Sequence, residues 1–454
     1  MSVQTEPREL GLSILGLGIQ YPPHSLDARA IEVLSKRYHP DSPAMQKVLA
    51  INRYTGIEKR SSIGQPDHWV VNQPSPPTIS QLHEIFMSDG VPLAISASQK
   101  AMAEAHIDDV SQITHMVSTT CTDSANPGYD HFVAKSLGLS PSVEKVLLHG
   151  VGCSGGLAAL RTAANICLGH SMRGLPARIL VLALEVSTTM VRSELESIHQ
   201  DQETRIGVCL FSDCASAVIL SNDIPFSAAE PIPPPVYSLL DWRHQTVPDT
   251  EQDLGFDTHP HGWKVVLTPR VPEVTKGVLV PTYNSLLSGT RTLPEGYDAP
   301  RDFDWAMHPG GATILTGAEK ALGIEPEHMR ASYDTYINHG NSSSATIFSV
   351  LDRLRQKDMD GVAPGGRGPK EMVVGCAFGP GITVEMCLLK RNLNKTEGRK
   401  GMETPPETES SSEDGEMGSD EGGTDSGEGE QRQETGKDRE EAFIEKALES
   451  VELD

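Results

Sequence analysis

The sequence predicts an α/β fold built from two similar halves and followed by an acidic C-terminal tail. Residues 146–167 read as a strand, a glycine-rich turn and a helix with apolar residues at spacings of three and four. The continuous apolar run at 179–184 is typical of a strand that is buried on both faces. Residues 302–391 repeat the order of strand, glycine turn, helix and closing hairpin, which indicates a duplicated unit.

The elements of the first half follow from local patterns. They are expected in the order strand 12–19, helix 27–50, helix 91–107 and a strand that ends near Cys121. After the strand at 179–184, residues 208–221 predict two strands around a Ser-Asp turn, with Phe211 close to the turn. The proline-rich stretch 223–235 then marks a connection. The predicted domains are therefore residues 1–235 and 236–392.

The acidic charge of the chain is concentrated at its C-terminal end. Residues 401–454 hold 19 Asp and Glu against 4 Lys and Arg, so they carry −15 of the net −24 and leave −9 for residues 1–400. This balance argues against nucleic acid as a partner, because phosphate backbones are bound by clustered Lys and Arg. Residues 393–454 are poor in apolar side chains, and we expect a disordered tail that could recruit a separate partner.

Cysteine usage and hydropathy indicate the compartment. The seven cysteines are scattered, with no CxxC pair and no dense secreted-type framework, which favours reduced thiols in a cytoplasmic protein. The longest apolar run, 179–184, is far below the roughly 18 residues that a membrane helix needs. The sequence therefore predicts a cytoplasmic protein without a membrane span.

Cys153 is the first candidate for a catalytic residue. Gly152, Gly155 and Gly156 clear side chains from around it, and a helix N-terminus favours a thiolate over a thiol. A lone cysteine is more often a small buried hydrophobic residue. The same letters also satisfy the G-x-S-x-G pattern of serine hydrolases, with Ser154 as the nucleophile. Only residues elsewhere in the chain can decide between these interpretations.

Several separated motifs agree in order with one known family. They are Gly152-Cys153 at a helix start, Phe211 in LFSDC, His308 in WAMHPGGATIL, Asn341 in HGNSSSATIF and FGPGITVE at 378–385. From about residue 10 to 392 the chain resembles the type III polyketide synthases, the chalcone-synthase-like branch of the thiolase superfamily. The resemblance implies a thiolase-like, duplicated five-layer αβαβα fold, acyltransferase activity and a homodimer.

The resemblance also implies how the catalytic residues act. Cys153 would hold an acyl chain, delivered as acyl-CoA, as a thioester. His308 would pair with the thiolate, and His308 and Asn341 would together bind the carbonyl oxygen of malonyl-CoA while carbon dioxide leaves. This chemistry requires neither a metal nor another cofactor. Taken alone, His308 could be a structural histidine and Asn341 a helix cap.

The substrate residues are inferred from the same resemblance. Lys47 matches a CoA-phosphate contact, and Arg53 is one place off another. Phe211 matches the first gatekeeper of the cavity, whereas Pro269 stands where the plant enzymes have a second gatekeeper phenylalanine. The positions that shape the cavity resemble fungal alkylresorcinol and alkylpyrone synthases, which use fatty acyl-CoA starters; these positions are Cys121, Ser187, Phe256 and Ser343.

Three alternatives remain open from the sequence. One is a β-ketoacyl synthase of the III type, which uses the same three catalytic residues but stops after one condensation. The second is the serine hydrolase built on Ser154. The third, from a different class, is a scaffold that acts through its acidic tail. The starter length, the number of extensions and the mode of ring closure depend on cavity volume and are left open as well.

Overall fold

The structure is a computed structural model of the 454-residue chain. It describes residues 10–228, 231–259, 262–290, 293–366 and 368–395. Of the predicted tail, residues 396–454 lie outside the described residues. The predicted division at 235/236 falls in the connection between strands β7 and β8 and stays a prediction.

The described residues form thirteen strands and twelve α-helices. The strands are β1 (Ser13–Gln20), β2 (His24–Leu26), β3 (Arg60–Ser62), β4 (His115–Thr119), β5 (Glu144–Leu148), β6 (Arg178–Glu185), β7 (Cys214–Ser221), β8 (Tyr237–Thr246), β9 (Leu254–His259), β10 (Gly262–Leu267), β11 (Asp304–Met307), β12 (Met372–Gly379) and β13 (Thr383–Arg391). The helices are α1 (Arg29–Tyr38), α2 (Pro43–Tyr54), α3 (Ile79–Ile85), α4 (Val91–Glu104), α5 (Tyr129–Leu137), α6 (Gly155–Met172), α7 (Val191–Asp201), α8 (Val271–Gly289), α9 (Ala312–Leu322), α10 (Arg330–His339), α11 (Thr346–Leu354) and α12 (Lys357–Gly361).

Nine of these strands form one mixed sheet with the order β11-β12-β13-β8-β1-β7-β6-β4-β5. The first half of the chain supplies β1 and β4–β7, and the second half supplies β8 and β11–β13. The two sets meet only where β1 pairs with β8, through Ser13 with Ser238 and Ile14 with Tyr237. The sheet is therefore two strand sets with a short junction, as a duplicated unit requires.

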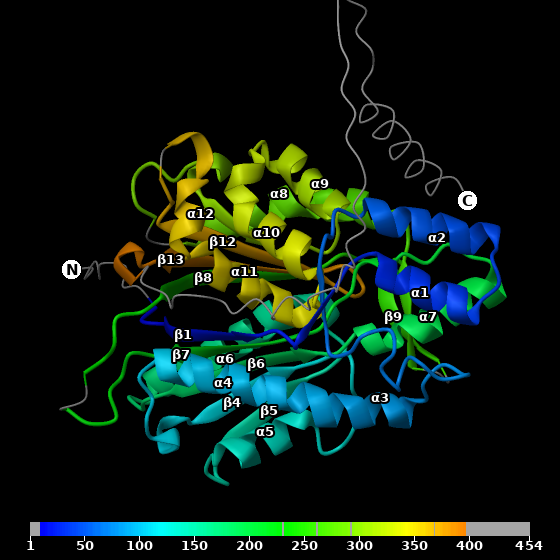
Figure 1. Ribbon diagram of the computed structural model, residues 1–454. Helices are drawn as coiled ribbons and strands as arrows, with labels where there is room; N and C mark the ends of the chain where they lie inside the picture. Colours follow the sequence, from blue (N-terminus) through cyan, green and yellow to red (C-terminus); the bar gives the residue numbers. More distant parts are fainter. Residues whose placement is uncertain (1–9, 229–230, 260–261, 291–292, 367, 396–454) are drawn as a thin grey trace, which may run out of the picture. The chain divides into compact units, whose positions relative to one another are not determined.

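Helices separate and cover the two strand sets (Figure 1). Helices α6 and α11 contact strands of both sets and lie between them. On the outer side of the first set lie α4 and α5, and on the outer side of the second set lie α8 and α9. Three buried apolar clusters fill the layer contacts: one on each outer side, and one around the central helices that reaches both strand sets. This is the five-layer αβαβα arrangement that the sequence predicted.

Strand β6 shows why its apolar run is continuous. The even-numbered residues from 180 to 184 pack in the outer cluster with α4, and the odd-numbered residues from 179 to 183 pack in the central cluster with α6 and α11. All eight residues of the strand are buried. The prediction of a strand buried on both faces is confirmed.

The predicted single helix at 27–50 is wrong, because two helices occupy that region. Helix α1 ends at Tyr38 and α2 begins at Pro43. Pro40 and Pro43 have no amide hydrogen and cannot continue an α-helix across this stretch. Ser42 instead caps the second helix, because its side chain accepts a hydrogen bond from Met45 N at 3.3 Å.

The predicted hairpin at 208–221 is also wrong. Only β7 is a strand, and residues Gly207–Cys209 form a short 3₁₀ helix. The backbone at 210–212 bonds to the segment around Asn341 instead of to β7. The backbone of residues 210–212 thus pairs with a segment more than a hundred residues away instead of with β7. The local alternation of apolar residues could not reveal this distant pairing.

The close approach of β1 to α4 gives a test of the packing. A Cβ atom on Gly18 would lie 2.0 Å from Ala97 O, so Gly18→Ala must push the helix from the sheet. We expect it to lower the free energy of unfolding by about 1–3 kcal/mol, measured by urea denaturation. In the control Gly169→Ala, where a helical Cβ meets nothing within 4 Å, stability should rise by up to about 1 kcal/mol. Equal stability of Gly18→Ala and the parent would contradict this packing.

Candidate active site

Cys153 lies in a tight turn between β5 and α6. It belongs to the short 3₁₀ helix Gly152–Ser154, and its side chain is half-buried. Gly152 has a φ of +46°, and a Cβ there would lie 2.6 Å from the ring of Pro380. A Cβ on Gly156 would meet Ser344 O at 2.5 Å. The glycines therefore allow segments of the second half to close over the thiol.

His308 and Asn341 come from the second half. His308 directly follows β11, is 1% exposed, and among the described residues neither of its ring nitrogens has a hydrogen-bond partner. Asn341 follows α10 and is 2% exposed. Its side-chain nitrogen donates to Gly310 O at 3.3 Å, and its side-chain oxygen accepts from Ser343 N at 2.8 Å. Asn341 is thereby tied to the turn that follows His308.

Asn341 is also tied to the first half of the chain. Its backbone N–H donates to Leu210 O at 3.0 Å, and its carbonyl accepts from Ser212 N at 2.9 Å. These bonds surround the isolated bridge between Asn341 and Phe211. The structure thus brings Cys153, Asn341 and Phe211 into one region, because the Cys153 thiol also interacts with the side chains of Asn341 and Ser343.

Burial disfavours the charged forms of both candidate residues, the Cys153 thiolate and the His308 imidazolium. Burial raises the pKa of the Cys153 thiol to about 11, although hydrogen bonds from Ser343 and Asn341 partly offset this shift. Burial lowers the pKa of His308 to about 3. Burial therefore favours the neutral thiol and the neutral imidazole, and an ion pair of the two groups would form only where each charge lies beside the other.

Cys121 and Ser343 meet beside Cys153, with their side-chain Sγ and Oγ atoms 3.4 Å apart. Cys121 also contacts Glu185, a fully buried acid at the end of β6. Glu185 accepts hydrogen bonds from Ser344 Oγ at 2.5 Å and Cys121 N at 3.1 Å. Burial raises the pKa of this carboxyl. The sequence analysis missed Glu185, although a lone acid that closes an apolar run was a usable signal.

Ser187 is held by a second buried acid that the sequence analysis missed. Ser187 N donates to Asp213 Oδ1 at 2.6 Å, and Ile63 N donates to Asp213 Oδ2 at 2.8 Å. Burial raises the pKa of Asp213 to about 6. Asp213, directly before β7, joins the loop after β6 to the segment after β3, and so fixes the position of Ser187.

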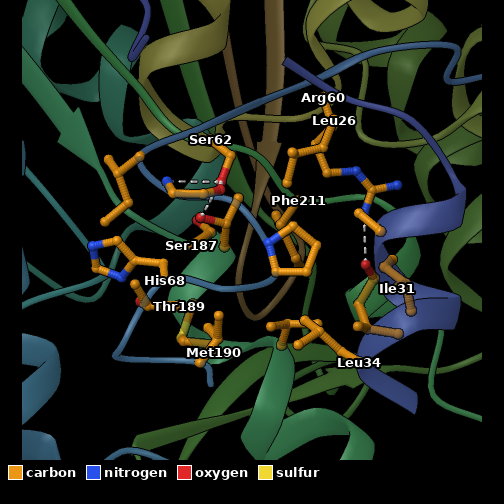
Figure 2. A pocket seen from close by; sticks show the side chains of 18 of the residues that line it. Leu26, Ile31, Leu34, Arg60, Ser62, His68, Ser187, Thr189, Met190 and Phe211 are labelled. Atoms are coloured by element: carbon orange, nitrogen blue, oxygen red, sulfur yellow. Dashed lines mark hydrogen bonds between the residues drawn. The ribbon is translucent and has the colours of Figure 1, made fainter. Parts of the chain in front are cut away.

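Ser187 and Phe211 line a cavity that opens to the solvent. Figure 2 shows Phe211 and Ser187 on one side, with Leu34 and Met190 facing them. Most of the lining is apolar, and it comes from α1, from the 60–71 segment and from α7. Sequence reasoning did not predict this wall, because its segments are separated by more than a hundred residues.

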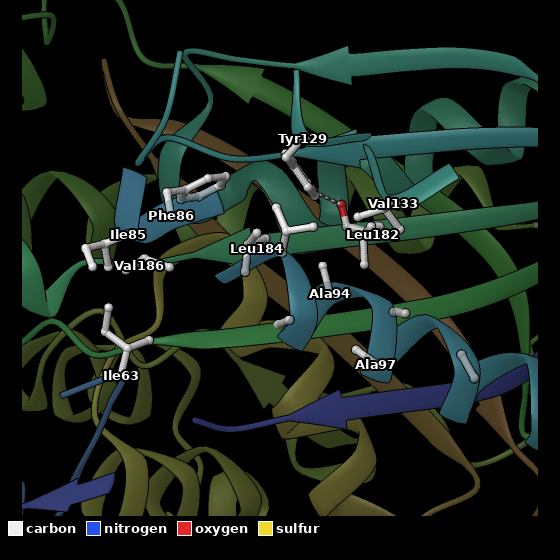
Figure 3. Close-up of a cluster of buried hydrophobic side chains, with 14 of the residues drawn as sticks. Ile63, Ile85, Phe86, Ala94, Ala97, Tyr129, Val133, Leu182, Leu184 and Val186 are labelled. Atoms are coloured by element: carbon white, nitrogen blue, oxygen red, sulfur yellow. Dashed lines mark hydrogen bonds between the residues drawn. The ribbon is translucent and has the colours of Figure 1, made fainter. Parts of the chain in front are cut away.

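The apolar cluster beneath the cavity supports its lining (Figure 3). Ile63 and Val186 belong to this cluster. Ile63 lines the cavity, and Val186 directly precedes Ser187, which also lines it. Leu184 continues the cluster along β6 towards α4. The position of the cavity wall therefore follows from the packing of the outer layer.

The remaining predicted residues lie further out. The Phe256 ring, on β9, is 5.7 Å from that of Phe211. Lys47 is half-buried on α2, and Arg53 on the same helix pairs with Glu32 at 2.7 Å. Pro269 is exposed in the turn between β10 and α8 and does not contribute to this cavity. Phe256, not Pro269, thus stands beside the first gatekeeper position.

Ser154 does not have the surroundings of a hydrolase nucleophile. Its side chain is fully buried, and its hydroxyl donates to Val151 O at 2.8 Å. A Cβ on Gly379 would lie 2.2 Å from that hydroxyl oxygen. No histidine contacts it among the residues that the structure describes. The G-x-S-x-G pattern is here a consequence of close packing.

In the described part of the chain, no cluster of three or more His, Cys, Asp or Glu has the arrangement of a metal site. None of the helices in this part combines the length and the apolar character needed to cross a membrane.

A duplicated αβαβα fold that brings a cysteine, a histidine and an asparagine together at its centre is the arrangement of the thiolase-like acyltransferases. The chain belongs to the chalcone and stilbene synthases. The N-terminal domain of that family matches residues 45–224, and the C-terminal domain matches residues 240–392. The protein is a type III polyketide synthase.

Fungal proteins are among its relatives. The type III polyketide synthase pspB of Penicillium soppii is 40% identical over 396 residues, which cover 84% of this chain and 96% of that protein. The acylalkylpyrone synthase csyB of Aspergillus oryzae is 37% identical over 383 residues, with coverages of 84% and 94%. The solved structure of a type III pentaketide synthase from Neurospora crassa is 72% identical, with a TM-score of 0.82 and coverages of 84% and 100%. That of CsyB complexed with CoA-SH is 37% identical, with a TM-score of 0.78 and coverages of 84% and 100%.

We propose that His308 accepts the proton of the Cys153 thiol, which predicts how the reactivity of the thiol depends on pH. In His308→Ala the thiol keeps its raised pKa and loses its proton acceptor, so alkylation by iodoacetamide should rise only at alkaline pH. The parent should keep a reactive plateau near neutral pH, and its rate at pH 7 should exceed that of the variant at least about tenfold. The measurement is the inactivation rate as a function of pH. Coinciding profiles would show that His308 does not receive the proton.

Proposed function

We propose that the protein loads a long-chain fatty acyl-CoA onto Cys153 and extends it repeatedly with malonyl-CoA. The product would then cyclise to an alkylresorcinol, a resorcylic acid or an alkyl-α-pyrone. The observation that carries this proposal is the largely apolar lining of the cavity formed by Ser187, Phe211 and their neighbours. It lies beside a region that already holds the candidate nucleophile.

The reaction begins with acyl transfer to the thiol. Cys153 passes its proton to His308 and attacks the acyl-CoA carbonyl, and the CoA thiolate leaves and takes that proton. Malonyl-CoA then binds with its thioester oxygen between His308 and Asn341. Loss of carbon dioxide leaves an enolate whose charge these two donors stabilise. The enolate carbon attacks the acyl thioester, the bond to Cys153 Sγ breaks, and the chain, now on CoA, is two carbons longer.

The cavity supplies the preference for a long starter. Each methylene that leaves water for an apolar wall contributes roughly 0.8 kcal/mol, so six of them contribute about 5 kcal/mol before ordering costs. Leu34 and Met190 offer such a wall, and the small Ser187 leaves the way into it open. Two relatives named as an acylalkylpyrone synthase and a pentaketide synthase support repeated extension of an acyl starter.

The CoA moieties would enter from the side of α2. We assign Lys47 as a phosphate contact, because it is half-buried there and the sequence resemblance marks the same position. Arg53 is the weaker candidate, since Glu32 already neutralises it at 2.7 Å. The pair of rings formed by Phe211 and Phe256 would gate the passage between CoA and the cavity.

The assembly, location and tail belong to the same proposal. Strand β5 is the last strand of the sheet and pairs with β4 on one side only. Its Val146 is 39% exposed, and in a homodimer a second copy would cover this edge. A nucleophilic thiol requires a reducing compartment, which favours the cytoplasm. The acidic charge of residues 401–454 suits a basic partner that plays no part in the chemistry.

The proposal is tested by mass spectrometry of the products formed from malonyl-CoA and a ladder of acyl-CoA starters. We expect products of several extensions, with kcat/KM highest for long starters. In Ser187→Phe the ring fills the way into the cavity, so kcat/KM for long starters should fall at least about tenfold while short starters remain active.

The matched control is Val33→Phe, which adds the same ring to α1 at a side chain that is 42% exposed and outside the cavity lining. It should keep the length profile of the parent. If Ser187→Phe and the parent share one profile, the cavity does not bind the acyl chain. A single extension with every starter would favour the β-ketoacyl synthase alternative.

A further inference from the structure

Cys121 is a second thiol in the region of Cys153, and it has no part in the proposed reaction. It follows β4, and Cys153 follows β5, which are neighbouring parallel strands whose last paired residues are Thr119 and Leu148. Neighbouring parallel strands end at the same edge of a sheet, so the segments that carry the two cysteines leave that edge next to each other. A thiol in this place can react with the nucleophile itself.

Ser343 contacts both thiols. Its Oγ lies 3.4 Å from Cys121 Sγ, and its side chain also hydrogen-bonds to the Cys153 thiol. Burial raises the pKa of Cys121, and the negative charges of Glu185 and Cys153 raise it further, because these groups lie close together. Since both sulfurs contact one oxygen atom, rotation about their Cα–Cβ bonds can bring them towards the distance of about 2 Å that a disulfide needs.

Glu185 gives Cys121 a base. The Cys121 thiol donates a hydrogen bond to Glu185 Oε2, with a sulfur–oxygen distance of 3.4 Å. The same oxygen accepts from Thr122 Oγ1 at 2.9 Å, which holds the carboxylate in this position. The thiolate, and not the thiol, is the nucleophile in disulfide chemistry, and a carboxylate in contact with the S–H group can take its proton. Cys121 therefore has the partner that a thiol needs to attack a neighbouring sulfur.

Exposure gives the two thiols different roles. Cys153 is half-buried, whereas Cys121 is 6% exposed and the other five cysteines are buried as well. Oxidation by a peroxide follows thiolate character and exposure, so Cys153 is the thiol that an oxidant reaches first. Redox-sensing cysteines commonly have a second thiol beside them that resolves the oxidised sulfur. Cys121 occupies that place.

We propose that Cys153 and Cys121 form a reversible disulfide that switches the enzyme off in the presence of a hydroperoxide and protects the nucleophile from further oxidation. This rests on the proposed role of Cys153 as the nucleophile that carries the acyl chain, since the disulfide leaves no free sulfur there. Ser343 keeps the two sulfurs together, and Glu185 is the base that activates Cys121.

The oxidation takes place in two steps. The Cys153 thiolate attacks one oxygen of hydrogen peroxide, the O–O bond breaks and a sulfenic acid forms, and the hydroxide that leaves takes up the proton that the thiol gave up. Cys121 then passes its proton to Glu185 and attacks the sulfenic sulfur. The sulfur–sulfur bond forms, the S–O bond breaks, and the leaving hydroxide takes the proton from Glu185. One peroxide is thus reduced to two water molecules while two thiols are oxidised to one disulfide.

The test treats the full-length protein with hydrogen peroxide in the absence of substrates and digests it without reduction for mass spectrometry. We expect a peptide pair that joins Cys121 to Cys153, and a turnover of malonyl-CoA and acyl-CoA that is lost on oxidation and restored by dithiothreitol. In Cys121→Ser the sulfenic acid has no resolving thiol and proceeds to the sulfinic acid, which dithiothreitol does not reduce. The restored fraction, relative to an untreated sample of the same protein, should therefore fall at least about fivefold.

The matched control is Cys167→Ser, which removes a fully buried thiol from α6, the helix that follows Cys153, and it should behave like the parent. If the parent gives no Cys121–Cys153 peptide pair, or if its restored fraction equals that of Cys121→Ser, the inference is overturned while the proposed function stands. An untreated parent without turnover would contradict the proposed function, and the peptide pair would still decide for or against the disulfide.

Discussion

The hydrogen bonds between Asn341 and residues 210–212 are the constraint on which the site depends. They tie the second half of the chain to the first near the candidate nucleophile Cys153, the candidate oxyanion donor Asn341 and the cavity residue Phe211. Gly340 makes the crossing geometrically feasible, because its φ of +75° and its approach to Leu210 O would strain any other residue. The crossing also explains why residues 208–213 abandon the hairpin that their sequence favours.

The central helical layer fixes the positions of the segments that carry the candidate site residues. Helix α6 begins next to Cys153, and α11 begins just after the segment that carries Asn341 and Ser343. Both helices pack between the two strand sets, so each terminus is fixed by contacts on two sides. The buried acids Glu185 and Asp213 then hold the loops after β4 and β6 in place. Duplication of the fold thereby brings one chemical group from each half to a shared centre.

Sequence patterns predicted those features that depend on near neighbours. The buried strand at 179–184, the helix at 91–107 and the turn around Cys153 follow from periodicity and glycine content. The roles of His308 and Asn341 came from the family resemblance, because nothing local distinguishes them from structural residues. The cavity wall could not be predicted, since it is made by segments that only the fold brings together, whereas Glu185 left a signal as a lone acid at the end of an apolar run.

The central claim is that Cys153 carries the growing chain, and acyl mapping tests it most directly. The protein is incubated with a long-chain fatty acyl-CoA in the absence of malonyl-CoA, digested, and searched by mass spectrometry for acyl thioesters on each of its seven cysteines. The account predicts one acyl group per chain, on the peptide that contains Cys153. An acyl group on another residue, with Cys153 unmodified, would contradict it.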